Sequence, residues 1–114
     1  MNLTREMAKR IAAVALKQIP EEAYRHAQRC MIDGLSVAVA GANETSTRLM
    51  RDFALNQGQA SGASLWAHPA QTTPLMAALV NGVAAHALDY DDIQQAVPLH
   101  GTVGVLPAIV AVAE

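Results

Sequence analysis

Three aspartates and one histidine in the second half of the 114-residue chain are the residues best suited to do chemistry. Asp89, Asp91 and Asp92 fall within four residues, and His100 follows after a short segment. We expect Asp89 near the C-terminal end of an apolar helix, where the helix dipole disfavours a negative charge by about 0.3 to 1 kcal/mol. Repulsion among neighbouring carboxylates also favours their protonated form, so one of them can give or take a proton. The spacing therefore indicates general acid–base chemistry.

His100 is expected at the start of the following helix. The positive end of that helix favours the neutral imidazole, which can act as a base or as a hydrogen-bond donor. After it, Gly101 and Thr102 have backbone N–H groups that can donate hydrogen bonds to an anion such as a substrate carboxylate. These residues complete a candidate site for a small acid.

Two other interpretations of the acidic segment stay open. Acidic clusters in loops are often solvated turns, and "DYDD" with a downstream histidine can bind a divalent metal ion. No recognised ligand pattern fits the spacing, so we expect no metal. His86, on the preceding helix, is expected to be a hydrogen-bonded core histidine, and Cys30 a small core residue.

The elements that must position these residues are helices. Apolar residues recur at helical spacing, and Asn2, Thr4, Pro20 and Thr73 are typical of helix starts. The fold class is therefore all-α, a bundle-like arrangement of about five helices in a single domain over residues 1–114. The expected helices span about 4–18, 20–41, 44–56, 74–88 and 101–113.

Two residues inside these helices carry specific expectations. Gly34 costs about 1 kcal/mol relative to alanine inside a helix, which predicts a close contact with another helix there. Pro107 predicts a kink in the last helix or a later start. The segment "ASLWAHPAQ" is expected to be a connector or a short extended piece.

Composition and charge exclude several classes of protein. The chain is 52% hydrophobic but only 4% aromatic, which favours closely packed helices over a β-sandwich. A net charge of −2 gives no reason to expect a nucleic-acid partner. No stretch reaches the roughly 18 to 20 consecutive apolar residues of a membrane span. The single Cys30 suits a reducing cytoplasm, where we expect the protein to lie.

The charges are distributed unevenly. All eight basic residues lie between Arg5 and Arg51, and no charged residue occurs between Phe53 and Leu88. A long uncharged, apolar segment favours burial, and the chain reads as a piece of a larger protein or as an obligate oligomer. We expect a homodimer or higher oligomer with these residues at or near the contact: Val103, Leu106, Ile109 and Val110.

Two stretches carry a resemblance to a known family. "LMAALVNGVAAHALDYDD" and the downstream "LHGTVGVLPAIVAVAE" resemble the signature of the MmgE/PrpD family, and "MIDGLSVAVAGA" resembles its early helix. The resemblance extends over essentially the whole chain. It implies a cofactor-independent lyase or isomerase of small polycarboxylates, such as 2-methylcitrate dehydratase, cis-aconitate decarboxylase or iminodisuccinate epimerase. Family members have a large helical domain, a smaller α+β lid domain and an active site between the two.

The resemblance also implies roles for individual residues. Asp89 matches the family's first motif aspartate and His100 its loop histidine, both linked to proton transfer. Substrate-binding residues that line or shape the pocket are expected at Tyr90, Asp91, Asp92, Gly101 and Thr102. Ile93 replaces a threonine common in the decarboxylase branch, and His100-Gly101-Thr102 replaces a common His-Pro-Ser, which weakens the decarboxylase assignment.

Length is the larger departure, because family members are several times longer. The lid domain and the downstream lysines have no counterpart here, so we expect the chain alone to be inactive. The leading hypothesis is the N-terminal helical segment of a lyase or epimerase resembling 2-methylcitrate dehydratase. The alternative is a non-catalytic helical interaction or oligomerisation module from a truncated gene.

Overall fold

A computed structural model describes residues 2–57 and 62–114, and within these ranges the fold is all-α, as predicted. Five α-helices are joined by one short 3-10 turn and one small hairpin. In chain order the elements are α1 (Leu3–Ala13), η1 (Leu16–Gln18), α2 (Glu21–Gly41), α3 (Thr45–Asn56), β1 (Ala63–Ser64), β2 (Gln71–Thr72), α4 (Pro74–His86) and α5 (Gly101–Ala113). No described helix has both the length and the apolar character needed to cross a membrane.

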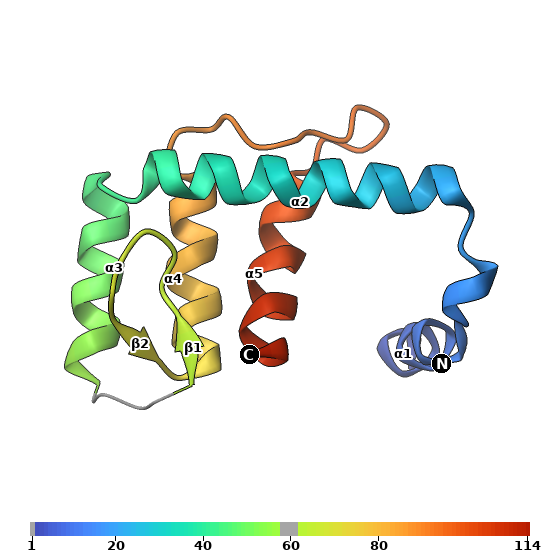
Figure 1. Cartoon of the computed structure of the whole chain (residues 1–114), viewed down its shortest axis with the longest axis horizontal. Coiled ribbons are helices and arrows are strands. Elements are labelled where there is room, and N and C mark those ends of the chain that lie inside the picture. The colour runs from blue at the N-terminus through green and yellow to red at the C-terminus, as the bar shows by residue number, and fades with distance from the viewer. Residues whose placement is uncertain (1, 58–61) are drawn as a thin grey trace.

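Helix α4 is the centre of the structure. It packs against α2, α3 and α5, while α2, the longest helix, runs across one end of the other three (Figure 1). The uncharged sequence of α4 allows this, because a helix with neighbours on several sides must be apolar on several sides. Its buried residues are Ala77, Val80, Asn81, Ala84 and Ala85.

Small residues let the helices approach closely. A Cβ atom added at Gly34 of α2 would lie 2.8 Å from the Leu106 side chain of α5, so the predicted close contact at Gly34 is confirmed. A Cβ atom at Gly41 would overlap the backbone oxygen of Ala84 in α4. The glycines of α2 therefore set how closely α4 and α5 approach it.

The connector between α3 and α4 is a short antiparallel hairpin, which pairs Ala63 with Thr72 and Ser64 with Gln71. Asn81 of α4 ties it to the core. Its amide oxygen accepts from the Trp66 backbone N–H at 2.9 Å, and its amide nitrogen donates to the Ser64 carbonyl at 2.9 Å. Asn81 is fully enclosed, so these bonds satisfy a polar group that would otherwise be costly to bury.

Helices α1, α2 and α4 differ at one end from the sequence expectations. Asn2 caps α1 as expected, but the helix ends at Ala13 instead of about residue 18. No α1 residue is buried, and an isolated short helix lacks the packing that would extend it. Pro20 is the N-cap of α2 instead of its first residue. Helix α5 spans Gly101–Ala113, as expected, with Pro107 inside it, so of the two effects expected of Pro107 the later start does not occur.

The start and end of α4 matter for the site. Thr73 caps its first turn by accepting from the Met76 backbone N–H at 3.3 Å. The helix ends at His86, two residues before the expected Leu88. The glycine-containing segment "NQGQASG", whose composition predicts the end of the third helix, lies partly outside the described residues, at 58–61.

Candidate active site

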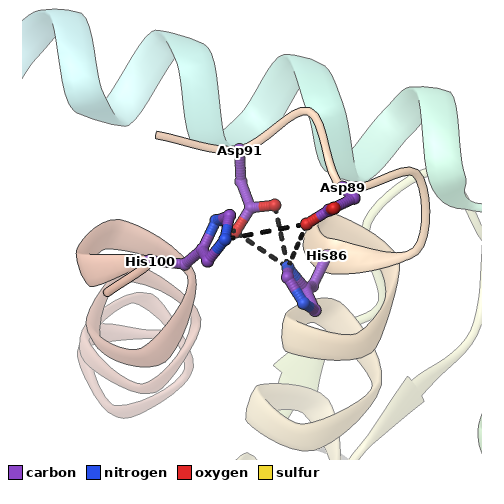
Figure 2. A group of neighbouring side chains, drawn as sticks. All are labelled: His86, Asp89, Asp91 and His100. Carbon is purple, nitrogen blue, oxygen red and sulfur yellow. Dashed lines mark hydrogen bonds and ion pairs between the residues drawn. The ribbon is translucent and has the colours of Figure 1, made fainter. Parts of the chain in front are cut away.

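The turn after α4 brings Asp89 into the site. The Asp89 backbone N–H donates to the His86 carbonyl at 3.0 Å, and Asp89 adopts a positive φ of 55°. Few residues other than glycine take this left-handed conformation, and aspartate is among those that do so most readily. The reversal turns the chain so that the side chains of Asp89 and Asp91 both face the start of α5 (Figure 2).

The Asp91 carboxylate is the most buried group of a cluster formed by His86, Asp89, Asp91 and His100. Its side chain is only 2% exposed, and its two oxygens lie 2.8 and 3.0 Å from Nδ1 of His86. Oδ2 of Asp91 also lies 3.0 Å from Nδ1 of His100. One buried carboxylate therefore lies between two imidazoles, one from the end of α4 and one from the start of α5.

Asp89 and His100, the predicted catalytic pair, are brought together. His100 Nε2 lies 3.6 Å from Asp89 Oδ1, and the rings of His86 and His100 meet edge to face with centroids 4.8 Å apart. Asp89 is mostly exposed, with 77% of its side chain accessible. The exposed carboxylate of Asp89 is thus paired with the less exposed imidazole of His100.

His100 lies close to the Asp91 carboxylate but forms no hydrogen bond with it. Its Nδ1 atom is buried and has no hydrogen-bond partner, although the Asp91 oxygen lies within ion-pair range. The ring is therefore not aligned for a linear N–H···O bond. Catalytic hydrogen bonds are often poorly aligned in a protein without its substrate.

The charge environment is clearest at His86. The hydrogen bond from its ring to Asp91 raises the pKa of His86 above the usual 6.5, and the charge of Asp91 adds to this effect. Partial desolvation opposes the rise, and the more distant Asp89 supports it. His86 therefore holds a proton more readily than an ordinary histidine.

Asp92 has a different role from its neighbours. It accepts from the Thr102 backbone N–H at 3.2 Å and from the Thr102 hydroxyl at 2.7 Å. Both donors lie in the first turn of α5, where backbone amides lack partners within the helix. Asp92 thus caps α5 and fixes the position of His100, and in this structure the polar groups of Asp92 and Thr102 are engaged with each other.

The family relationship can be stated once this geometry is known. Residues 5–114 match the family described as MmgE/PrpD N-terminal domain. The chain belongs to the MmgE/PrpD family. The predicted resemblance is therefore confirmed at the level of the family.

Curated relatives add similarity to named proteins. The chain is 26% identical over 118 residues to a cis-aconitate decarboxylase-like protein of Aspergillus oryzae, covering 99% of this chain and 23% of that protein. It is 25% identical over 114 residues to the cis-aconitate decarboxylase of Mus musculus, with the same coverage. The Homo sapiens protein of that name is also 25% identical, and 24% of it is covered. The chain thus spans about a quarter of the length of these relatives.

The remaining predicted site residues of this MmgE/PrpD chain lie around the cluster. Tyr90 is exposed, and the position that a Cβ atom of Gly101 would occupy is open, with no atom within 4 Å. Asp91, which was expected to line or shape the substrate pocket, has a buried side chain. Its carboxylate contacts the rings of His86 and His100.

Two hollows flank the cluster. One of about 490 Å³ lies between α2 and α5 and includes Asp92, Gly101 and Thr102 in its lining. Another of about 480 Å³, between α4 and α5, is lined by His86 and apolar residues. Asp89 and His100 line neither of these two hollows.

His86 was not predicted to belong to the candidate site, although its ring contacts Asp91. It was expected to be a core histidine, but half of its side chain is exposed. The available signal was its spacing, because residues three apart at a helix end lie on the same side, which aligns His86 with Asp89. The bond to Asp91 needed the tight turn, which spacing alone does not reveal.

Proposed function

We propose that this chain supplies the proton-transfer residues of an MmgE/PrpD-type lyase or epimerase acting on small polycarboxylates. The observation that carries the proposal is the 3.6 Å separation between Asp89 Oδ1 and His100 Nε2. A carboxylate and an imidazole this close can exchange a proton directly or through a substrate placed between them. The buried Asp91 supports the imidazole from the opposite side.

The favoured reaction is elimination of water from a hydroxy-tricarboxylate, as in a 2-methylcitrate dehydratase. One group of the pair removes the proton on the carbon next to a carboxylate, and those electrons form the carbon–carbon double bond. The carbon–oxygen bond of the neighbouring hydroxyl breaks, and the other group protonates the departing oxygen to give water. Asp89 is the more accessible of the two and therefore the one that contacts the substrate first.

Decarboxylation is the second candidate, because the similar relatives carry that name. It needs the same groups, since the carbon that loses carbon dioxide must receive a proton. Ile93 argues for dehydration, because an exposed apolar side chain stands where the decarboxylase branch has a hydroxyl. Both reactions place a proton-transfer pair beside a polyanion.

The sequence provides no lysine or arginine near Asp89 and His100 to bind an anionic substrate. From Asp52 onwards the sequence contains no lysine or arginine. A polyanionic substrate close to Asp89 would be repelled by about 1 kcal/mol per close pair even in water. Turnover therefore requires cationic groups that this part of the chain does not provide.

A graft tests the proposal. Residues 5–114 replace the matching segment of the mouse cis-aconitate decarboxylase, and turnover of cis-aconitate and of 2-methylcitrate is measured with Asp89→Asn and His100→Gln variants. We expect each variant to lower turnover by about 100-fold or more, as for loss of a general acid or base, and Asp33→Asn on the exposed face of α2 to leave it unchanged.

A smaller graft of residues 86–100 alone applies the same comparison with less disturbance to folding. An active graft that is insensitive to both Asp89→Asn and His100→Gln would contradict the proposed roles. The ratio of the two turnover rates decides between dehydration and decarboxylation.

We also propose that the chain associates with copies of itself. Three apolar residues on one face of α5 are each more than half exposed: Val105, Ile109 and Val112. Apolar faces of this kind are usually covered in soluble proteins. One expected contact residue must be withdrawn, because Leu106 is buried against Gly34 within the same chain.

A further inference from the structure

Four potential ligand atoms for a metal ion converge between α4 and α5. His86, Asp89, Asp91 and His100 each offer one nitrogen or oxygen, and these atoms all lie within 4.8 Å of one another (Figure 2). All four residues come from one short stretch of chain, so the turn after α4 and the start of α5 fix their arrangement. Two imidazoles with two carboxylates form a donor set typical of divalent transition-metal ions.

We propose that this cluster binds one divalent transition-metal ion of the Zn²⁺ class. The proposal goes beyond the acid–base function, because binding the ion requires no substrate and no turnover. It rests on the convergence of the donors and on a second, independent observation at His100.

That observation is an unpaired buried nitrogen. His100 Nδ1 is inaccessible to solvent and has no hydrogen-bond partner, although Asp91 Oδ2 is only 3.0 Å away. Buried polar atoms in native proteins nearly always have a partner, so an orphaned one needs an explanation. An ion between His100 and Asp91 would supply that partner.

The distances require only small adjustments. Tetrahedral zinc sites have ligand bonds of about 2.0 to 2.2 Å, which separates neighbouring donors by roughly 3.3 to 3.6 Å. His86 Nδ1 now lies 2.8 Å from Asp91 and 4.0 Å from Asp89, so the first separation must widen and the second must shorten. Asp89 and His86 are both at least half exposed and free to move, while the buried Asp91 is the fixed point.

Charge favours the ion as well. The two carboxylates of the cluster have His86 and His100 as ion-pair partners, and the sequence has no lysine or arginine beyond Arg51. A metal ion would displace any proton from these rings and would itself offset the charge of the carboxylates. A divalent cation would balance both. Because the ion would occupy Asp89 and His100 together, it would also stop them from exchanging protons, so metal binding would inhibit the proposed reaction.

The test uses the 114-residue chain after treatment with a chelator. Zn²⁺ is titrated calorimetrically, and Co²⁺ is added as a spectroscopic probe whose visible absorption reports four-coordinate nitrogen and oxygen ligation. We expect one equivalent of either ion to bind. Asp89→Asn and His86→Gln should each weaken binding by about tenfold or more.

Asp89→Asn is the deciding variant, because the residue is exposed and asparagine accepts the same left-handed backbone. The matched control is His26→Gln on α2, since His26 lies 3.6 Å from Cys30 Sγ and the two offer a second pair of zinc ligands. Circular dichroism confirms that each variant keeps its helices.

Two results would overturn the proposal. One is the absence of saturable Zn²⁺ or Co²⁺ binding in the micromolar range. The other is binding at residues outside the cluster, shown when it survives both Asp89→Asn and His86→Gln or is lost with His26→Gln. Neither result bears on the acid–base function, which is tested separately by turnover of the grafted protein.

Discussion

The buried carboxylate of Asp91 lies 2.8 Å from Nδ1 of His86, and this contact joins the end of α4 to the turn that follows it. The same carboxylate lies 3.0 Å from Nδ1 of His100. Asp91 therefore lies between two rings from two helices, and its own side chain is only 2% exposed.

The first prediction concerns this carboxylate. Asp91→Ala should lower the free energy of unfolding by about 1 to 3 kcal/mol, because it removes a buried acceptor and leaves His86 without its partner. Urea denaturation measures the change. Asp33→Asn, on the exposed face of α2, should change the stability by less than about 0.5 kcal/mol. Equal effects of the two substitutions would show that the Asp91 contact contributes little.

The second prediction is a pH dependence of stability that runs through His86. Its pKa is raised in the folded protein, so the folded state binds the proton more tightly than the unfolded state does. The stabilisation is fully present below about pH 6.5, the pKa of an unfolded histidine, and is lost as the pH rises through the raised value. Wild-type protein and His86→Gln should therefore differ in stability most at low pH.

Denaturation midpoints measured with chelator present, from about pH 5.5 to pH 8, provide the test. The chelator keeps metal binding from contributing to the result. A difference between wild type and His86→Gln that stays constant across this range would contradict the assignment.

The third prediction uses two helical glycines that differ in their surroundings. Gly41→Ala should destabilise the protein by about 1 to 3 kcal/mol, because the new Cβ atom meets the rigid backbone oxygen of Ala84. Gly104→Ala in α5 should be neutral or stabilising by up to about 1 kcal/mol, since nothing lies within 4 Å of its Cβ position. Thermal denaturation of both variants measures the contrast, and similar effects would mean that the α2–α4 contact is looser than described.

The fourth prediction is self-association. Light scattering should give a mass of at least twice the 12.0 kDa of one chain at micromolar concentration. Ile109→Asp should lower that mass by placing a charge on the exposed face of α5, whereas Ile93→Asp in the loop after α4 should not. A stable 12.0 kDa monomer would count against the proposal.

The fifth prediction concerns catalysis by the chain on its own. The 114-residue protein should show no turnover of 2-methylcitrate, citrate or cis-aconitate, because the part of the chain with Asp89 and His100 has no lysine or arginine to hold a polyanion. Product formation is followed by chromatography. Turnover abolished by Asp89→Asn would show that the chain needs no further cationic groups.

The sequence by itself determined the helices and the family. Local signals that act within a few residues fixed most of the starts and ends, among them the cap at Thr73, the end of α2 at Gly41 and the extent of α5. The motif from Asn81 to His100 pointed to the MmgE/PrpD family, and the chain matches that family over residues 5–114. The early end of α1 was not foreseeable, because it depends on packing that the helix does not receive.

The tertiary structure alone decided which site residues are exposed, which are buried and what each one contacts. Spacing placed three aspartates together but could not tell them apart, since exposure depends on what packs above each one. The left-handed turn at Asp89 leaves that carboxylate in solvent, buries Asp91 between two imidazoles and directs Asp92 to the first turn of α5. The role of His86 emerged in the same way, because its bond to Asp91 forms only when the chain reverses at the end of α4.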